Sequence, residues 1–170
     1  MIKVVCGDIT KLEVDAIVNA ANSALVDGSG VNGAIHKVAG HELSEACQRI
    51  RGGCPAGEAR ITPGFRLPAR FVIHTVGPVW RGGSHGEAEL LAKCYHESFK
   101  LALDYDVQSI AFSSISTGVF GYPKDKAAEI AVREMRTFEN HFAQIVACCF
   151  SREDEKRYLT LLNRVDSPPE

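Results

Sequence analysis

The residues best suited to chemistry lie in a glycine-rich stretch near the start of the chain. Asn19 and Asn22 follow a short apolar run, and Gly28, Gly30 and Gly33 come next, before apolar residues return at helical spacing. A strand, a glycine loop and a helix start, in that order, bring free backbone N–H groups close to an anion. Glycine allows this approach because it has no Cβ and adopts positive φ angles. The stretch fits a phosphate-binding loop and a long surface turn equally well.

A second loop of the same kind follows a later apolar run. The segment SSISTGVFGYP, residues 113–123, combines small hydroxyl side chains with two glycines and one aromatic ring, and Pro123 stands where a helix would begin. Both loops follow strands and precede helices, so in a parallel sheet they leave the same edge, where ligands of this architecture bind. Two such loops could clamp a diphosphate from both sides, which favours the phosphate interpretation.

Two further polar residues lie at or within predicted strands. Asp8 ends the first strand, in the segment GDIT. Its carboxylate could cap nearby N–H groups, or it could accept a hydrogen bond from an exocyclic amine such as that of adenine. His74 lies inside an apolar run, where a satisfied core side chain is more common than a catalyst.

The elements that must position these loops alternate along the chain. We expect strands at residues 2–6, 15–18, 70–76, 109–112 and 144–150, with a short edge strand at 58–62. We expect helices at residues 32–39, 43–50, 87–103, 125–142 and 152–164. This alternation predicts an α/β fold, a three-layer α/β/α sandwich around a mixed, mostly parallel central sheet. Residues 1–165 are expected to form one domain and residues 166–170 a disordered tail.

Composition excludes several classes of function. The net charge of −2 gives no basic field for nucleic acid, and no apolar run is long enough for a membrane span or a signal peptide. The six cysteines form no C-x-x-C pair, so we expect no metal site, free thiols and a cytoplasmic location. The phosphate-loop NTPase motif is missing from the sequence. We expect a monomer without a cofactor.

Five motifs, in this order, resemble the macrodomain family. They are GDIT at residues 7–10, VNAAN at 18–22, GSGVNGAIH at 28–36, HTVGP at 74–78 and STGVFGYP at 116–123. Their spacing is similar to that of the MacroD-type branch, which includes bacterial O-acetyl-ADP-ribose deacetylases. The resemblance covers nearly the whole chain, and five motifs in register are far more specific than one glycine loop.

The resemblance implies an ADP-ribose pocket. Asp8 would bind the adenine amine with the Ile9 backbone beside it, and Phe150 would lie against the adenine ring. Phe120 would cover the distal ribose, and Asn22 would hydrogen-bond that ribose near its reacting carbon. The two loops would hold the diphosphate, largely through backbone N–H groups, with Gly28, Ser29, Gly30 and Val31 from the first loop and Ser116, Thr117, Gly118 and Val119 from the second.

The implied reaction is hydrolysis at the distal ribose. Members of the family remove ADP-ribose from acidic side chains of mono-ADP-ribosylated proteins, or remove acetyl from O-acetyl-ADP-ribose. A water held between a ligand phosphate and the loop would be the nucleophile, with Asn22 and Asn32 as the candidate catalytic residues that orient it. Positioning would then supply much of the rate.

The chain departs from the MacroD-type pattern at three positions. Asn32 stands where Asp is usual, and an amide cannot supply general-base catalysis, which is worth roughly 10²–10⁴-fold. Ser29 replaces a common glycine and Ser113 a usual proline, changes expected to tune the loops without abolishing binding. Asn32 therefore leaves two functions open, a hydrolase of ADP-ribose esters and a non-catalytic ADP-ribose reader. An RNA ligand is disfavoured by the acidic balance.

Overall fold

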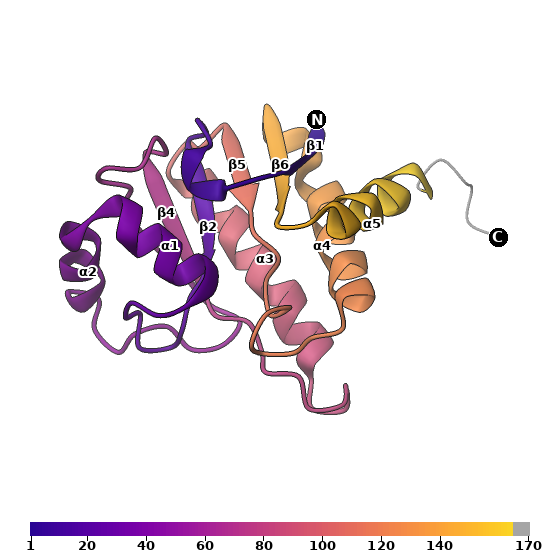
Figure 1. The fold of residues 1–170 in the computed structure, drawn as a ribbon, viewed down its shortest axis with the longest axis horizontal. Coiled ribbons are helices and arrows are strands. Elements are labelled where there is room, and N and C mark those ends of the chain that lie inside the picture. The colour runs from indigo at the N-terminus through magenta and orange to yellow at the C-terminus, as the bar shows by residue number, and fades with distance from the viewer. Residues whose placement is uncertain (165–170) are drawn as a thin grey trace.

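The protein forms a six-stranded sheet with helices on both faces (Figure 1). The computed structural model describes residues 1–164, and the predicted tail at 166–170 lies outside the described residues. The strands are β1 Ile2–Cys6, β2 Ala16–Ala20, β3 Ala59–Pro63, β4 Phe71–Thr75, β5 Ser109–Phe112 and β6 Gln144–Cys149. Their order across the sheet is β1-β6-β5-β2-β4-β3, and all neighbours are parallel except β3 and β4. The predicted mixed, mostly parallel sheet is confirmed.

Within residues 1–164, five helices cover the two faces of the sheet, which confirms the three-layer sandwich. They are α1 Gly30–Ala39, α2 His41–Gln48, α3 Glu87–Asp104, α4 Lys124–Phe138 and α5 Arg152–Asn163. In Figure 1, α1 and α2 lie on the left, and α4 and α5 lie on the right. Successive strand residues point to opposite faces, so Ile17 belongs to the core that includes α1 and α2, while Val18 belongs to the core on the other face, which includes residues of α3, α4 and α5.

The central strand β2 runs two residues beyond its predicted end. Asn19 and Ala20 continue the ladder, opposite His74 and Thr75 of β4. The polar side chain of Asn19 concealed this, because a strand buried on both faces normally reads as an unbroken apolar run. Asn19 is therefore a fully buried residue of the sheet and not part of the loop.

The helix that follows the first glycine loop begins earlier than predicted. The N–H of Gly33 donates to the carbonyl of Ser29, at 3.2 Å, so the first turn of α1 already contains Gly30 and Val31. The predicted helix at 125–142 is α4 followed by a 3₁₀ turn, Glu139–His141. A second 3₁₀ turn, Ile9–Lys11, follows β1. The earlier start of α1 places the N-terminus of this helix directly beside the first glycine loop.

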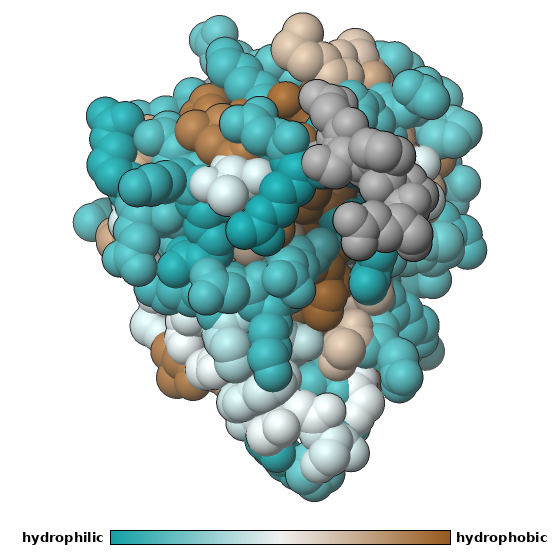
Figure 2. Space-filling view, turned by 90° about the vertical axis from the view of Figure 1, so that its right-hand side faces the viewer, coloured by the Kyte–Doolittle hydropathy of each residue, from teal (hydrophilic) through white to brown (hydrophobic). Residues whose placement is uncertain are grey.

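Polar side chains cover most of the face formed by the right-hand side of Figure 1, as Figure 2 shows. Apolar patches on this face are small and interrupted by hydrophilic residues. Within residues 1–164, each helix is too short or too polar to cross a lipid bilayer.

Candidate functional site

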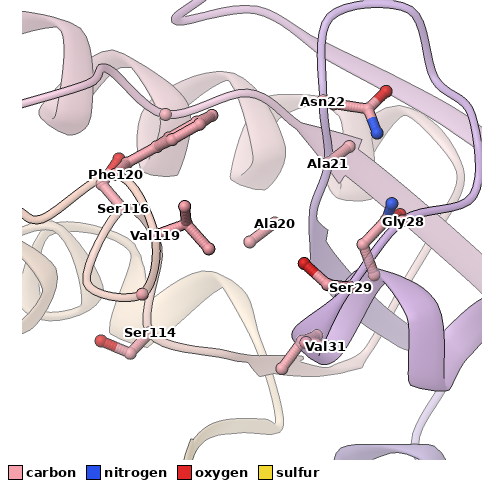
Figure 3. Close-up of a pocket in the computed structure, with 14 residues that line it drawn as sticks. Ala20, Ala21, Asn22, Gly28, Ser29, Val31, Ser114, Ser116, Val119 and Phe120 are labelled. Carbon is pink, nitrogen blue, oxygen red and sulfur yellow. The ribbon is translucent and has the colours of Figure 1, made fainter.

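A cavity of about 350 Å³ opens at the carboxyl ends of β2, β4 and β5, between the two glycine loops (Figure 3). This volume is within the range of small-molecule sites. Figure 3 shows Ser116, Val119 and Phe120 on one side, Ser29 and Val31 on the other, and Ala20 between them. The residues that line it are Ala20, Ala21, Asn22, Gly28, Ser29, Gly30, Val31, Asn32, Gly77, Ser114, Ser116, Gly118, Val119 and Phe120.

Two amide side chains fix the first wall of the cavity by binding the same carbonyl. Asn22 Nδ2 donates to the carbonyl of Val26 at 2.8 Å, and Asn32 Nδ2 donates to it at 2.9 Å. Asn22 Oδ1 also accepts from the N–H of Val26, at 3.0 Å. A carbonyl oxygen has two lone pairs, so it can accept both bonds. The two candidate catalytic residues therefore hold the loop between them in one conformation.

A buried chain of neutral polar groups sets the orientation of Asn32. Asn32 Oδ1 accepts from Asn19 Nδ2 at 2.8 Å, and the same Nδ2 lies 3.2 Å from His74 Nδ1. His74 Nε2 in turn lies 3.0 Å from Thr62 Oγ1. Because Asn19 donates, His74 accepts at Nδ1 and carries its proton on Nε2, toward Thr62. This series of side chains thus links the cavity to β3, which lies two strands away from β2.

This hydrogen-bonded series of side chains stays uncharged because His74 is buried. Desolvation, and next the nearby His36, lowers the pKa of His74 to about 3. The prediction that His74 is a core side chain is consistent with its exposed fraction of 1% and its three polar neighbours. Asn32 therefore faces a neutral donor and not a charged group.

The protonation of His74 should make folding stability depend on pH. Below pH 6.5 the unfolded chain binds a proton at His74 that the folded chain excludes until about pH 3, so stability falls as pH falls through this window. Between pH 7 and pH 5 the wild type should lose about 2 kcal/mol more than His74→Gln, measured by urea unfolding. The exposed His41→Gln is the control variant. Equal losses in the wild type and His74→Gln would contradict this.

The second wall is a tight loop held against β2 and β4. Ser116 has a φ of +68°, a conformation that is unfavourable for a residue with a Cβ and often found at functional sites. Its carbonyl accepts from the N–H of Tyr122 at 2.9 Å. Gly77 packs so closely that a Cβ there would lie 2.0 Å from Ser116 Oγ. Ser113 donates from its hydroxyl to the carbonyl of Val18 at 3.0 Å, and this bond ties the loop to the sheet.

The cavity contains most of the residues predicted for the site, but four lie outside its lining. Thr117 lies beside it, with its hydroxyl 2.7 Å from that of Ser114. Asp8, Ile9 and Phe150 follow β1 and β6, whose ends lie side by side. Four lining residues were not predicted, because small side chains and backbone carry no chemical signal, namely Ala20, Ala21, Gly77 and Ser114. For Gly77, its position at a strand end was the available signal.

Asp8 caps the 3₁₀ turn after β1. Its Oδ1 accepts from the N–H of Thr10 at 2.9 Å and from the Thr10 hydroxyl at 2.6 Å. Hydrogen bonds from the side chain and then the backbone of Thr10 lower the pKa of Asp8, so the group is a carboxylate at neutral pH. Asp8 is exposed, and so is Phe150, at 92%. The structure thus brings an exposed carboxylate and an exposed aromatic ring to neighbouring strand ends.

The sequence is similar to those of known macro domain proteins. The family model described as Macro domain matches residues 18–131. A macro domain-containing protein of Chlorobaculum tepidum is 59% identical, with 91% of each chain covered, and a Citrobacter rodentium protein named O-acetyl-ADP-ribose deacetylase is 54% identical, with 96% of each covered.

Solved structures agree with the sequence comparison. The Oceanobacillus iheyensis macrodomain with ADP superposes with a TM-score of 0.91 at 45% identity, covering 95% of this chain and 90% of that one. The Trypanosoma brucei macrodomain in complex with ADP-ribose gives 0.88 at 42% identity, covering 95% of this chain and 68% of that one. By motif, fold and site, and by these likenesses, the chain belongs to the macro domain family.

Proposed function

We propose that this protein binds ADP-ribose in the cavity and hydrolyses an ester at its distal ribose. The observation that carries the proposal is the cavity itself, which lies between two glycine loops at one sheet edge and is lined largely by backbone and small side chains. Backbone N–H groups in such loops bind phosphate oxygens without a cationic side chain. The solved relatives that hold ADP or ADP-ribose support the choice of ligand.

The two ends of the ligand have separate partners in this proposal. The adenine amine donates to Asp8, beside the Ile9 backbone, and the ring lies against Phe150. The diphosphate lies between residues 28–31 and residues 116–119. Phe120 covers the distal ribose and Asn22 hydrogen-bonds it. The exposure of Phe150 and the carboxylate state of Asp8 support the adenine assignment, because both groups are free to meet a ligand.

In the proposed reaction, water attacks the ester carbonyl and the bond from the acyl carbon to the ribose oxygen breaks. The products are a carboxylic acid and free ADP-ribose, whether the acyl group is acetyl or an acidic side chain of a protein. Asn22 and Asn32 position the water and the ribose. Asn32 accepts no proton, because it is an amide, so its contribution is geometric. The relatives named O-acetyl-ADP-ribose deacetylase, at 50–54% identity, support this reaction.

The alternative is a reader that binds ADP-ribose without turnover. The contacts of Asn32 favour it, because both ends of its amide are already bound, to Asn19 and to Val26, and neither end is a base. Both functions require ADP-ribose binding. The proposals of a monomer and of a cytoplasmic location are independent of this choice and stay predictions.

Calorimetric titration with free ADP-ribose tests the binding common to both functions. We expect measurable heat with one site per chain, together with a rise in the unfolding temperature at saturating ligand. Absence of both signals would contradict the proposed function in either form.

Asp8→Ala should weaken ADP-ribose binding by roughly 10- to 100-fold, the effect of losing a hydrogen bond to a charged group. The same change removes a helix cap and should lower stability by about 1 kcal/mol, so affinity is measured well below the unfolding temperature. Glu13→Ala removes a nearby exposed carboxylate and serves as the control. Unchanged affinity in Asp8→Ala would refute the adenine role.

A further inference from the structure

A buried carboxylate outside the cavity organises a neighbouring turn. Glu87, the first residue of α3, is only 1% exposed. Its Oε2 accepts from the N–H groups of Arg81 and Gly83, both at 2.9 Å, and its Oε1 accepts from that of His85 at 2.6 Å. Burial alone would raise the pKa of Glu87, but these backbone N–H groups outweigh burial and lower it to about 2. The carboxylate is therefore charged, and it holds three donors of one short turn.

The turn fixes Trp80, the only tryptophan of the chain. Gly82 and Gly83 have φ angles of +96° and +94°, which turn the chain back over the indole ring. A Cβ on Gly83 would lie 2.8 Å from Cη2 of Trp80, so this backbone rests on the ring. The indole also contacts the ring of Tyr122, with ring centroids 4.7 Å apart. The ammonium group of Lys126 lies 5.4 Å from the centroid of the indole.

Trp80 in turn holds the second wall of the cavity. Its backbone N–H donates to the carbonyl of Phe120 at 2.8 Å. Its ring contacts the ring of Tyr122, so Trp80 contacts the loop on both sides of Gly121. Phe120 lines the cavity, whereas Trp80 and the turn at residues 81–85 do not. A continuous series of contacts thus runs from Glu87 to the wall of the site.

We propose that Glu87 is a positioning residue for the ADP-ribose site, which fixes the turn at residues 81–85 and, through Trp80, the place of Phe120. The inference rests on the proposed function, because it assigns Phe120 to the distal ribose. It adds a residue that neither lines the cavity nor touches the ligand. Mutations along such contact networks typically change binding by about 2- to 30-fold.

Glu87→Gln tests the proposal with little change in size. In Glu87→Gln, an amide nitrogen replaces one of the two carboxylate oxygens. This nitrogen is a donor, so it cannot accept hydrogen bonds from the backbone N–H groups that the oxygen bound in the wild type. We expect the dissociation constant for ADP-ribose to rise about fivefold, with a smaller rise for ADP, which lacks the distal ribose. Glu89→Gln changes an exposed carboxylate in the same turn of α3 and is the matched control. Affinities are measured by calorimetry well below the unfolding temperature of each variant.

The ADP-ribose to ADP comparison separates positioning from mere support of the fold. A general loss of folded protein would lower the active fraction for both ligands equally. Trp80 emission gives a second readout, because ADP-ribose binding should change it in the wild type and change it less in Glu87→Gln. A folded Glu87→Gln variant with wild-type affinity for both ligands would overturn the inference and leave the proposed function intact. Failure of the wild type itself to bind ADP-ribose would instead overturn the proposed function.

Hydrogen exchange in the wild type keeps the test decisive if Glu87→Gln does not fold. ADP-ribose should slow exchange of the amides of Arg81, Gly83 and His85, which donate to Glu87 and lie outside the cavity. Protection confined to the two cavity loops would overturn the inference.

Discussion

Gly33→Ala should reduce hydrolysis of O-acetyl-ADP-ribose by roughly 100-fold, the cost of misplacing an active-site group by about 1 Å. A Cβ at Gly33 would lie 2.3 Å from the carbonyl oxygen of Gly28, closer than any tolerated contact. The Gly28 carbonyl belongs to the backbone and cannot swing aside as a flexible side chain could, so the first loop must move. The displaced residues would include Gly28 and Ser29, which we assign to the diphosphate.

The measurement is the initial rate at saturating substrate together with the affinity for ADP-ribose. Ala34→Ser adds one heavy atom at the next position, where α1 faces solvent, and should leave both quantities unchanged. A Gly33→Ala protein that binds and turns over like the wild type would show that the loop at residues 28–33 does not hold the ligand.

Asn32→Asp should raise the rate of hydrolysis by about 100-fold, the lower end of what general-base help supplies. In the wild type, Asn32 Nδ2 donates to the carbonyl of Val26 at 2.9 Å. A carboxylate oxygen in that place would face another acceptor, so the side chain must turn toward the cavity. The lost hydrogen bond should cost about 1 kcal/mol of stability. Asn22 still donates to the Val26 carbonyl, so the loop keeps one of its two clamps.

The pH dependence of the rate identifies the new group. In Asn32→Asp the gain in rate should disappear below the pKa of the added carboxyl group. The wild type has no carboxylate at this position, so its rate should lack that step. An unchanged rate in Asn32→Asp would mean that positioning of the water by the phosphate and by Asn22 is sufficient.

The sheet edge that carries the site was predictable, because it depends on local pattern. Strands alternate with helices, and parallel strands place their following loops at one edge. The two glycine loops are visible in the sequence from their glycines and their place between strands and helices, and the structure brings residues 28–31, Ser116 and residues 118–120 together around one cavity. The short edge strand expected at residues 58–62 is β3, and its antiparallel pairing with β4 is visible only in the structure.

The interior contacts of the site were not predictable, because they join residues far apart in the sequence. Asn19 follows the predicted end of the strand at residue 18, yet it lies within β2 and bonds to His74, 55 residues away. Glu87 reads as an ordinary acidic residue in the first turn of a helix, where a negative charge is favourable in any protein. Its three backbone donors are visible only in the folded chain. A sequence pattern shows only which residues are neighbours along the chain. The roles of Asn19 and Glu87 depend on contacts that form only in the folded chain.

The most direct test of hydrolysis is to follow product release by the wild-type protein over time. One reaction contains O-acetyl-ADP-ribose, and a parallel one contains a protein mono-ADP-ribosylated on acidic side chains. The proposed function predicts release of acetate or of free ADP-ribose over many turnovers, faster than in a reaction without protein. Tight ADP-ribose binding with no release above that background from either substrate would contradict hydrolysis and leave the protein as a reader.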